Sequence, residues 1–318
     1  MAAVNLGDLL VTTARAFSKT VADNVTNNNA LLKYLNKRGN VKEKLGGGRV
    51  IDEYLMYNTN GSVSPYTDYD TFTPPTTGQE VIDAAEYAWK QTGGFVAISG
   101  REEAMNAGEF QRKDLLTARL DQLDANIQNS IAAQLFSNGT GSGGKEIGGL
   151  QLLVADAPSG AGTVGGINQA TNSFWRNYAS GTVTVTSGDI QGRMNTAWLS
   201  TFRGTDQIDL ILADSTLYST YWASLQAIQR ITTAEEGKAG FATLKYQAAD
   251  VVYDYNCPSK HMYFLNTKYL ACKYAPGKWF TTGDKRTIAN ADYVVVPMWV
   301  MCNLTTGRRA AHGVLVDD

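Results

Sequence analysis

The sequence predicts an α+β fold in which one long helix packs on a sheet. Between residues 109 and 137, leucine and isoleucine recur every three or four positions, which places them on one face of a helix. No second helix of comparable length is predicted, so this apolar face is expected to lie on a sheet and not in a helix bundle. From residue 187 onward, helix-like and strand-like segments alternate, as in a compact α/β unit.

The long helix, or spine, is predicted over residues 109–137. Twenty-nine residues, at a rise of about 1.5 Å each, make a rod roughly 43 Å long. Asn106, with Glu109 three residues later, is predicted to cap its N-terminus, and Asn138-Gly139 supplies a left-handed stop. Its apolar stripe consists of Leu116, Leu120, Leu123, Ile127, Ile131 and Leu135.

A basic arm and an acidic excursion come before the spine. Residues 1–48 contain seven Lys or Arg and three Asp or Glu, whereas residues 49–100 contain two Lys or Arg and seven Asp or Glu. Two short helices are predicted in the arm, the second at 30–37. The excursion is rich in Tyr but poor in aliphatic clusters, which favours two long strands, at 49–57 and 66–72, supported by a neighbour. The opposite charges of the arm and the excursion predict that they meet between subunits, in a contact that added salt weakens. The alternative is that both are solvated segments whose charges make no such contact.

The region after the spine is predicted to contain further helices and strands. A loop should span 137–149, and the last strand should return the chain end to the body. Helices are predicted at 189–202 and 214–228, and strands at 150–154, 207–213, 251–254, 261–265, 293–301 and 308–316.

Composition excludes several classes of protein. A chain of 318 residues that is 43% hydrophobic can build a large core, and its net charge of −2 argues against extensive neutralisation of nucleic acid. Asp8 and Arg15 interrupt any export signal, and the apolar run 294–302 is too short to span a membrane. A soluble chain made in the cytoplasm, with no membrane partner, is expected. Its three cysteines, Cys257, Cys272 and Cys302, are predicted to be buried thiols.

No catalytic, cofactor-binding or metal-binding residue is predicted. Residues 160–165 spell G-x-G-x-x-G, but Asp156 and Pro158 separate the glycines from the preceding strand and no long helix follows, so the dinucleotide-binding context is missing. Cys257 and His261 are four residues apart, and the intervening proline prevents the helix that would bring them together. His312 is expected to be an ordinary surface or partly buried residue.

Several stretches carry a family likeness. The most specific runs from Gly162 through Thr171 to Phe174-Trp175-Arg176-Asn177, and others are 22–32, 84–91 and 147–150. In these the chain resembles the major capsid proteins of tailed bacteriophages, which share the Johnson fold. Gln169 departs from this pattern, which predicts a basic residue there, and that leaves a local salt bridge in question.

The resemblance implies a division of the chain. It comprises an N-arm (1–48), an extended E-loop lying over a neighbouring subunit (49–98), a peripheral domain (99–186) with the spine helix at 109–137, an axial domain (187–275), and a return to the peripheral domain (276–318).

It also implies a structural protein without an active site. The chain would self-assemble into hexamers and pentamers of an icosahedral head around double-stranded DNA. Its partners would be itself, a scaffolding protein, a portal, DNA contacted non-specifically on the inner face, and a decoration protein. It would be assembled in the bacterial cytoplasm and located in the virion. Two alternatives remain, a cellular encapsulating shell protein of the same fold and a nucleotide-binding enzyme.

Overall fold

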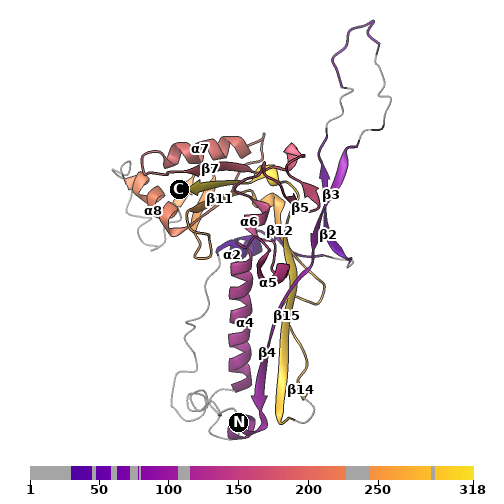
Figure 1. The fold of residues 1–318 in the computed structure, drawn as a ribbon, viewed down its shortest axis with the longest axis vertical. Helices are drawn as coiled ribbons and strands as arrows, with labels where there is room; N and C mark the ends of the chain where they lie inside the picture. Colours follow the sequence, from indigo (N-terminus) through magenta and orange to yellow (C-terminus); the bar gives the residue numbers. More distant parts are fainter. Residues whose placement is uncertain are drawn as a thin grey trace.

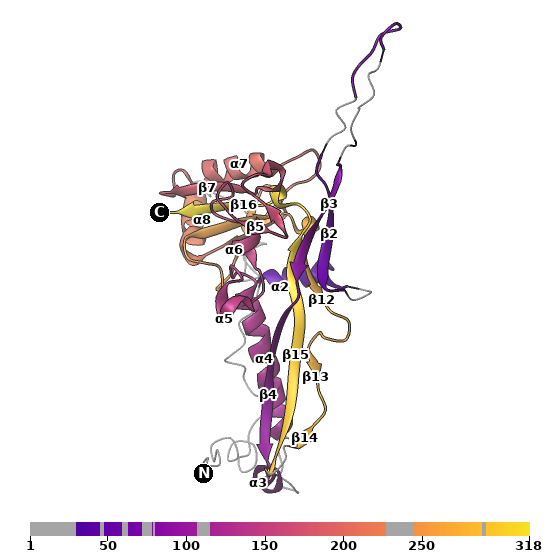
Figure 2. The same ribbon diagram turned by 45° about the vertical axis from the view of Figure 1, so that its right-hand side comes forward.

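The computed structural model describes residues 30–44, 48–58, 63–71, 78, 80–106, 115–226, 244–287 and 291–318. The molecule is elongated, with a compact α/β unit at one end of a long stalk and a two-stranded ribbon that leaves the junction between them (Figures 1 and 2). The helices are α2 (Ala30–Lys37), α3 (Gly100–Met105), α4 (Leu115–Gln134), α5 (Gly141–Gly144), α6 (Leu150–Leu153), α7 (Ile190–Thr201) and α8 (Ser215–Gln226), with 3-10 turns η2 (Ser173–Trp175), η4 (Thr267–Tyr269) and η5 (Arg309–Ala311).

The strands form two six-stranded sheets and two hairpins. The stalk sheet contains β1 (Val41–Glu43), β4 (Lys90–Ser99), β12 (Leu270–Tyr274), β13 (Thr281–Thr282), β14 (Arg286–Thr287) and β15 (Tyr293–Thr306). The sheet of the α/β unit has the order β7 (Tyr178–Val183), β16 (Gly313–Asp317), β11 (His261–Leu265), β8 (Leu210–Ala213), β10 (Ala249–Tyr253) and β9 (Leu244–Tyr246). The hairpins pair β2 (Val50–Met56) with β3 (Ile82–Ala88), and β5 (Thr163–Val164) with β6 (Ile167–Asn168).

The stalk consists of α4 lying along β4 and β15 (Figure 1), as the spine-on-sheet prediction requires. Its thin end holds a small cluster in which Leu115 packs with Val96 and Ile98 of β4, and the leucines of the predicted stripe join it partly buried. The other half of the stripe, ending in Ile131 and Leu135, is fully buried in the main core at the junction. One face of the helix is therefore apolar throughout, but burial increases toward the α/β unit.

The predicted C-terminal end of the spine is wrong, and its N-cap stays a prediction. Asn106 ends α3, and residues 107–114, with Glu109, lie outside the described residues. At the other end, α4 stops at Gln134, because the Leu150 N–H donates to the Leu135 carbonyl at 2.7 Å and takes an acceptor that a longer helix would use. Gly139 does have a positive φ of 76°, but it lies beyond the helix end.

The α/β unit buries both faces of its sheet. Strand β8 is buried at all four residues, as expected for a central strand covered on both sides. Its Ile211 and Ala213 face the core formed with α7 and α8, whereas Leu210 and Leu212 face the main core. The helices and strands predicted between 189 and 265 are confirmed, although residues 227–243 lie outside the described residues.

Two predicted strands are wrong. Residues 150–154 form the short helix α6, because a short apolar run does not distinguish a strand from a buried helical turn. Residues 66–71 contain no strand, and Phe72 lies outside the described residues. The second strand of the excursion is instead β3, which pairs with β2 in antiparallel register from Val50↔Ala88 to Met56↔Ile82.

The chain end returns to the body as predicted, and β16 lies between β7 and β11. Strands from distant parts of the chain thus share sheets, with β1 and β4 pairing with β12 and β15. The division into arm, loop and domains stays a prediction.

Candidate assembly surfaces

The outer face of the ribbon is apolar and exposed. Because side chains alternate across a strand, Ile51 and Leu55 of β2 face the core, whereas Tyr54 and Met56 face outward with 79% and 77% of their surface accessible. Ile82, opposite Met56 on β3, is 68% exposed. An exposed patch of large apolar side chains is typical of an interface.

The Gly-rich motif of the sequence supports the root of this ribbon. Its last glycine, Gly165, lies in the turn of the β5–β6 hairpin, and the Gly165 carbonyl accepts a hydrogen bond from the Glu86 N–H at 3.0 Å. Gly165 has φ +61°, and a Cβ there would lie 2.9 Å from Ala85, so the position requires glycine. Trp175 Nε1 donates to the Val164 carbonyl at 2.9 Å. These residues hold a hairpin against the ribbon, and the strand-to-helix turn of a dinucleotide site is not formed there.

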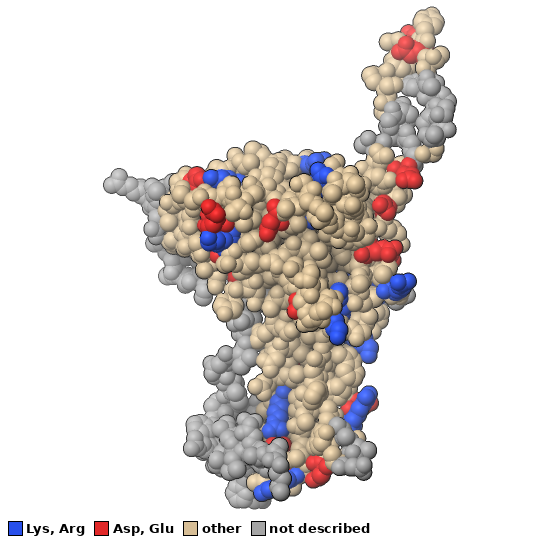
Figure 3. Space-filling view, viewed as in Figure 1, with Lys and Arg blue, Asp and Glu red and all other residues tan. Residues whose placement is uncertain are grey.

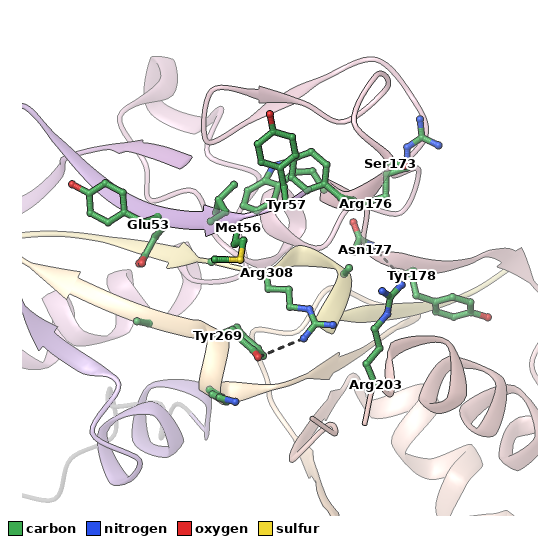
Figure 4. A pocket seen from close by; sticks show the side chains of 18 of the residues that line it. Glu53, Met56, Tyr57, Ser173, Arg176, Asn177, Tyr178, Arg203, Tyr269 and Arg308 are labelled. Atoms are coloured by element: carbon green, nitrogen blue, oxygen red, sulfur yellow. Dashed lines mark hydrogen bonds between the residues drawn. The ribbon is translucent and has the colours of Figure 1, made fainter. Parts of the chain in front are cut away.

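A cleft of about 880 Å³ lies between the ribbon root and the body. Figure 4 shows Met56 and Tyr57 on the ribbon side and Arg203, Tyr269 and Arg308 on the other. The ring of Tyr57 stacks on Phe174 at 4.8 Å between centroids, which gives the cleft an aromatic wall. Its charged lining residues are Lys42, Arg176, Arg203, Lys268, Lys273 and Arg308, with Glu53 as the one carboxylate.

Part of the charge of the excursion is neutralised within the chain. Lys44 of the arm lies 3.4 Å from Asp52, and Lys273 lies 2.7 Å from Glu53. Figure 3 shows the remaining acidic side chains along the ribbon and at its tip. Residues 1–29 of the arm lie outside the described residues, so the predicted contact between the arm of one subunit and the excursion of another stays a prediction. Where the structure describes both segments, Lys44 of the arm pairs with Asp52 of the excursion within the same chain.

Arg309 is completely buried at the junction of the loop segments 150–177 and the chain end. Its guanidinium donates to the carbonyls of Leu153 (2.6 Å) and Trp175 (3.1 Å), and to side-chain oxygens of Gln169 (2.9 Å) and Asn177 (3.1 Å). No carboxylate of the described residues forms an ion pair with it, and burial lowers its pKa to about 10. Gln169 thus accepts a hydrogen bond from the buried arginine through its uncharged amide oxygen and forms no salt bridge, which answers the question that its departure from the family pattern raised.

The prediction for His312 is wrong, because its side chain is fully buried. Its Nε2 lies 3.1 Å from Thr306 Oγ1, and its Nδ1 accepts from the Asn266 N–H at 3.3 Å. Burial, and then the nearby charges of Arg309 and Arg308, lower its pKa to about 3. The ring is therefore a neutral structural group.

His261 faces oxygen atoms at both ring nitrogens. Nδ1 lies 2.7 Å from the Ser259 carbonyl and Nε2 lies 3.2 Å from Asp156 Oδ2. A neutral imidazole carries one proton and satisfies one of these acceptors, whereas the imidazolium satisfies both. The hydrogen bond to Asp156 accordingly raises the pKa of His261, against the lowering effect of burial.

This pair predicts a pH-dependent term in stability. Because the pKa of His261 is raised in the folded chain, its contribution is complete below the ordinary value of about 6.5 and is lost as the pH rises through the folded value. Asp156→Asn should remove this term. We expect the difference in unfolding free energy between wild type and variant to shrink from pH 5 to pH 8, measured by urea denaturation. His312 opposes this trend in both chains, so it cancels in the difference; a difference independent of pH would contradict the assignment.

The described residues show no cluster that points to metal chemistry. They contain no group of three His, Cys, Asp or Glu side chains placed to hold a metal ion. Cys257, Cys272 and Cys302 are all buried and free, as predicted, and Cys257 Sγ contacts the backbone carbonyl of His261 and not its ring. Within the described part of the chain, no helix is long and apolar enough to cross a membrane.

Comparison with solved structures identifies the fold. The capsid protein of cyanophage A-1(L) superposes with a TM-score of 0.72 at 17% identity, over 96% of each chain. The capsid protein of the Myoviridae phage XM1 superposes with a TM-score of 0.59 at 11% identity, over 100% of each chain. This chain has the Johnson fold of tailed-phage major capsid proteins. The SrpI encapsulin of Synechococcus elongatus shares the Johnson fold with it, at a TM-score of 0.61 and 10% identity over 99% of this chain and 96% of that one.

No protein-family model and no curated protein sequence matches the chain. The likeness to known proteins thus lies in the Johnson fold, and it spans both the stalk and the α/β unit.

Proposed function

We propose that this chain is the major capsid protein of a tailed bacteriophage, a structural subunit that assembles into pentamers and hexamers of an icosahedral head around double-stranded DNA. The observation that carries the proposal is the whole-chain superposition on the cyanophage A-1(L) capsid protein. The exposed apolar face of the ribbon supports it, since Tyr54, Met56 and Ile82 lack cover in the single chain and a neighbouring copy would supply it. The role is structural and involves no catalysis.

The proposal brings partners and a location with it. Other copies of the chain are the principal partner, a scaffolding protein and a portal take part in assembly, and the inner face contacts packaged DNA without sequence specificity. A decoration protein binds the finished shell. The chain is made and assembled in the bacterial cytoplasm and ends in the virion.

A cellular encapsulating shell is the second candidate, favoured by the superposition on the SrpI encapsulin. The two functions differ in what the particle encloses. A phage head contains nucleic acid, whereas an encapsulating shell contains protein cargo.

Expression of the full chain tests the proposal. We expect closed particles or ring-shaped capsomers in negative-stain images, and a corresponding fast fraction in sedimentation velocity. A chain that remains a monomer at every concentration, and whose melting temperature rises with a nucleotide cofactor, would instead support the enzyme hypothesis. Nucleic acid or protein recovered from particles purified from their native source then separates the two shell functions.

A further inference from the structure

We propose that the acidic tip of the ribbon of one subunit binds in the basic cleft at the ribbon root of the next subunit. The tip comprises residues 63–71, and the cleft is the one between the ribbon root and the body. This inference rests on the proposed function, and it names the surfaces that join neighbouring subunits.

The cleft has an excess of positive charge. Asp206 lies beside it and accepts hydrogen bonds from Lys268 (2.9 Å) and Arg308 (3.0 Å), while Glu53 pairs with Lys273. Counting both carboxylates, the cleft still carries a net charge of +4. Lys42 and Arg203 are exposed, and neither forms an ion pair with a carboxylate of the described residues. These two cations are available to an incoming anion.

The tip has the complementary chemistry. Between residues 54 and 79 the charged residues are Asp68 and Asp70 alone. Asp70 accepts from the Thr67 N–H at 2.8 Å and from Thr67 Oγ1 at 3.1 Å, which fixes a turn that presents Tyr69 with 98% of its surface exposed. A turn of acidic and aromatic residues matches a cleft that offers cations and the exposed apolar side chains of Tyr54 and Met56.

The tip and the cleft lie apart in the single chain, which assigns the contact to two different subunits. Tip and cleft lie at opposite ends of the same excursion (Figure 1), and each limb of about 12 residues reaches at most ~40 Å from the root. The tip of one subunit and the cleft of the next are two different surfaces, so the contact is heterologous, or head-to-tail. Contacts of this kind form a closed ring when the rotation from one subunit to the next adds up to a full turn. Repeated around an axis, one contact of this kind joins every subunit of a pentamer or hexamer.

The aromatic residues favour a protein occupant over a phosphate backbone. Arg176 donates to the Gln169 carbonyl at 2.8 Å, and Lys268, Lys273 and Arg308 have carboxylate partners, so most of the cations are already engaged. The cleft is also lined by Tyr57 and Phe174, which nucleic acid would meet only through exposed bases. An acidic, tyrosine-bearing loop uses both the charge and the apolar wall.

Charge reversal in the full-length chain tests the contact. Asp68→Lys with Asp70→Asn gives the tip variant, in which asparagine keeps an acceptor for Thr67; Lys42→Glu with Arg203→Glu gives the cleft variant. We expect each variant to form about ten-fold fewer particles or capsomers than wild type at equal concentration. The tip variant brings a positive tip to a cleft of net charge +4, and the cleft variant lowers that net charge to zero and removes the attraction. All four changes in one chain should assemble better than the tip variant alone, because the repulsion is removed. Arg101→Glu with Lys245→Glu, at exposed sites outside the cleft, is the charge-matched control.

A mixture of the two variants gives a sharper readout. In the mixture, the unchanged acidic tip of the cleft variant meets the unchanged basic cleft of the tip variant, so an equimolar mixture should assemble better than either variant alone. Equal unfolding midpoints would show that the variants fold. Normal assembly of every variant would overturn the inference. Normal assembly with loss of the enclosed DNA would overturn it too, because the cleft would then bind the phosphates of DNA and not the tip of a neighbouring subunit. Failure of the wild-type chain to assemble would instead count against the proposed function.

Discussion

Replacing Arg309 with methionine should destabilise the subunit by about 3–5 kcal/mol. Methionine fills much of the volume of the arginine chain but donates no hydrogen bond. Three buried acceptors would lose their donor, the Leu153 and Trp175 carbonyls and the side-chain oxygen of Gln169, whereas Asn177 Oδ1 keeps the Ala155 N–H at 3.1 Å. Each unsatisfied buried acceptor costs about 1–3 kcal/mol, partly recovered by local relaxation. Urea denaturation of the unassembled chain measures the change.

The neighbouring arginine provides the matched control. Arg308 has 30% of its side chain exposed and pairs with Asp206 at 3.0 Å, so Arg308→Met should cost about 1 kcal/mol or less. An Arg309→Met chain as stable as Arg308→Met would show that the buried guanidinium does not hold the segment 150–177 to the chain end.

The sequence predicted those features that depend on local pattern. The spine was predictable because its leucines and isoleucines repeat at the helical period, and the buried strand β8 because it is continuously apolar. The C-terminal end of the spine was not predictable from Asn138-Gly139, because the hydrogen bond that accompanies it, from the Leu150 N–H to the Leu135 carbonyl, is not a local sequence signal. A local signal for α3 was missed: Ser99 and Glu102 form a capping box that begins α3, and the S-x-x-E spacing is visible in the sequence.

Arg309 and the cleft were missed for a different reason. The partners of Arg309 are 132 to 156 residues away along the chain, and no local spacing reports such contacts. The cleft likewise collects cations from β1, from the turn after α7, from η4 and from β12. The acidic excursion, in contrast, was evident from charge counts alone, so sequence predicted one half of the proposed contact and the fold supplied the other.

Polar substitution on the outer face of the ribbon should abolish assembly while leaving the subunit folded. The variant combines Tyr54→Thr, Met56→Thr and Ile82→Thr, and threonine is well suited to a strand. The three original side chains are at least 68% exposed in the single chain, so they contribute little to the free energy of folding. The unfolding midpoint should therefore barely change. If a neighbouring copy covers this face, burial of each large apolar side chain contributes about 1.5–3 kcal/mol, and its loss at every contact of a shell should reduce particle formation by far more than ten-fold, measured by sedimentation velocity.

The opposite face of the same strand separates folding from assembly. Ile51 is fully buried against the main core, so Ile51→Thr should cost several kcal/mol of unfolding free energy and affect assembly only through that loss. A triple variant that forms particles as well as wild type would mean that the exposed apolar face is not a contact between subunits, because these side chains are mostly exposed to solvent in the single chain.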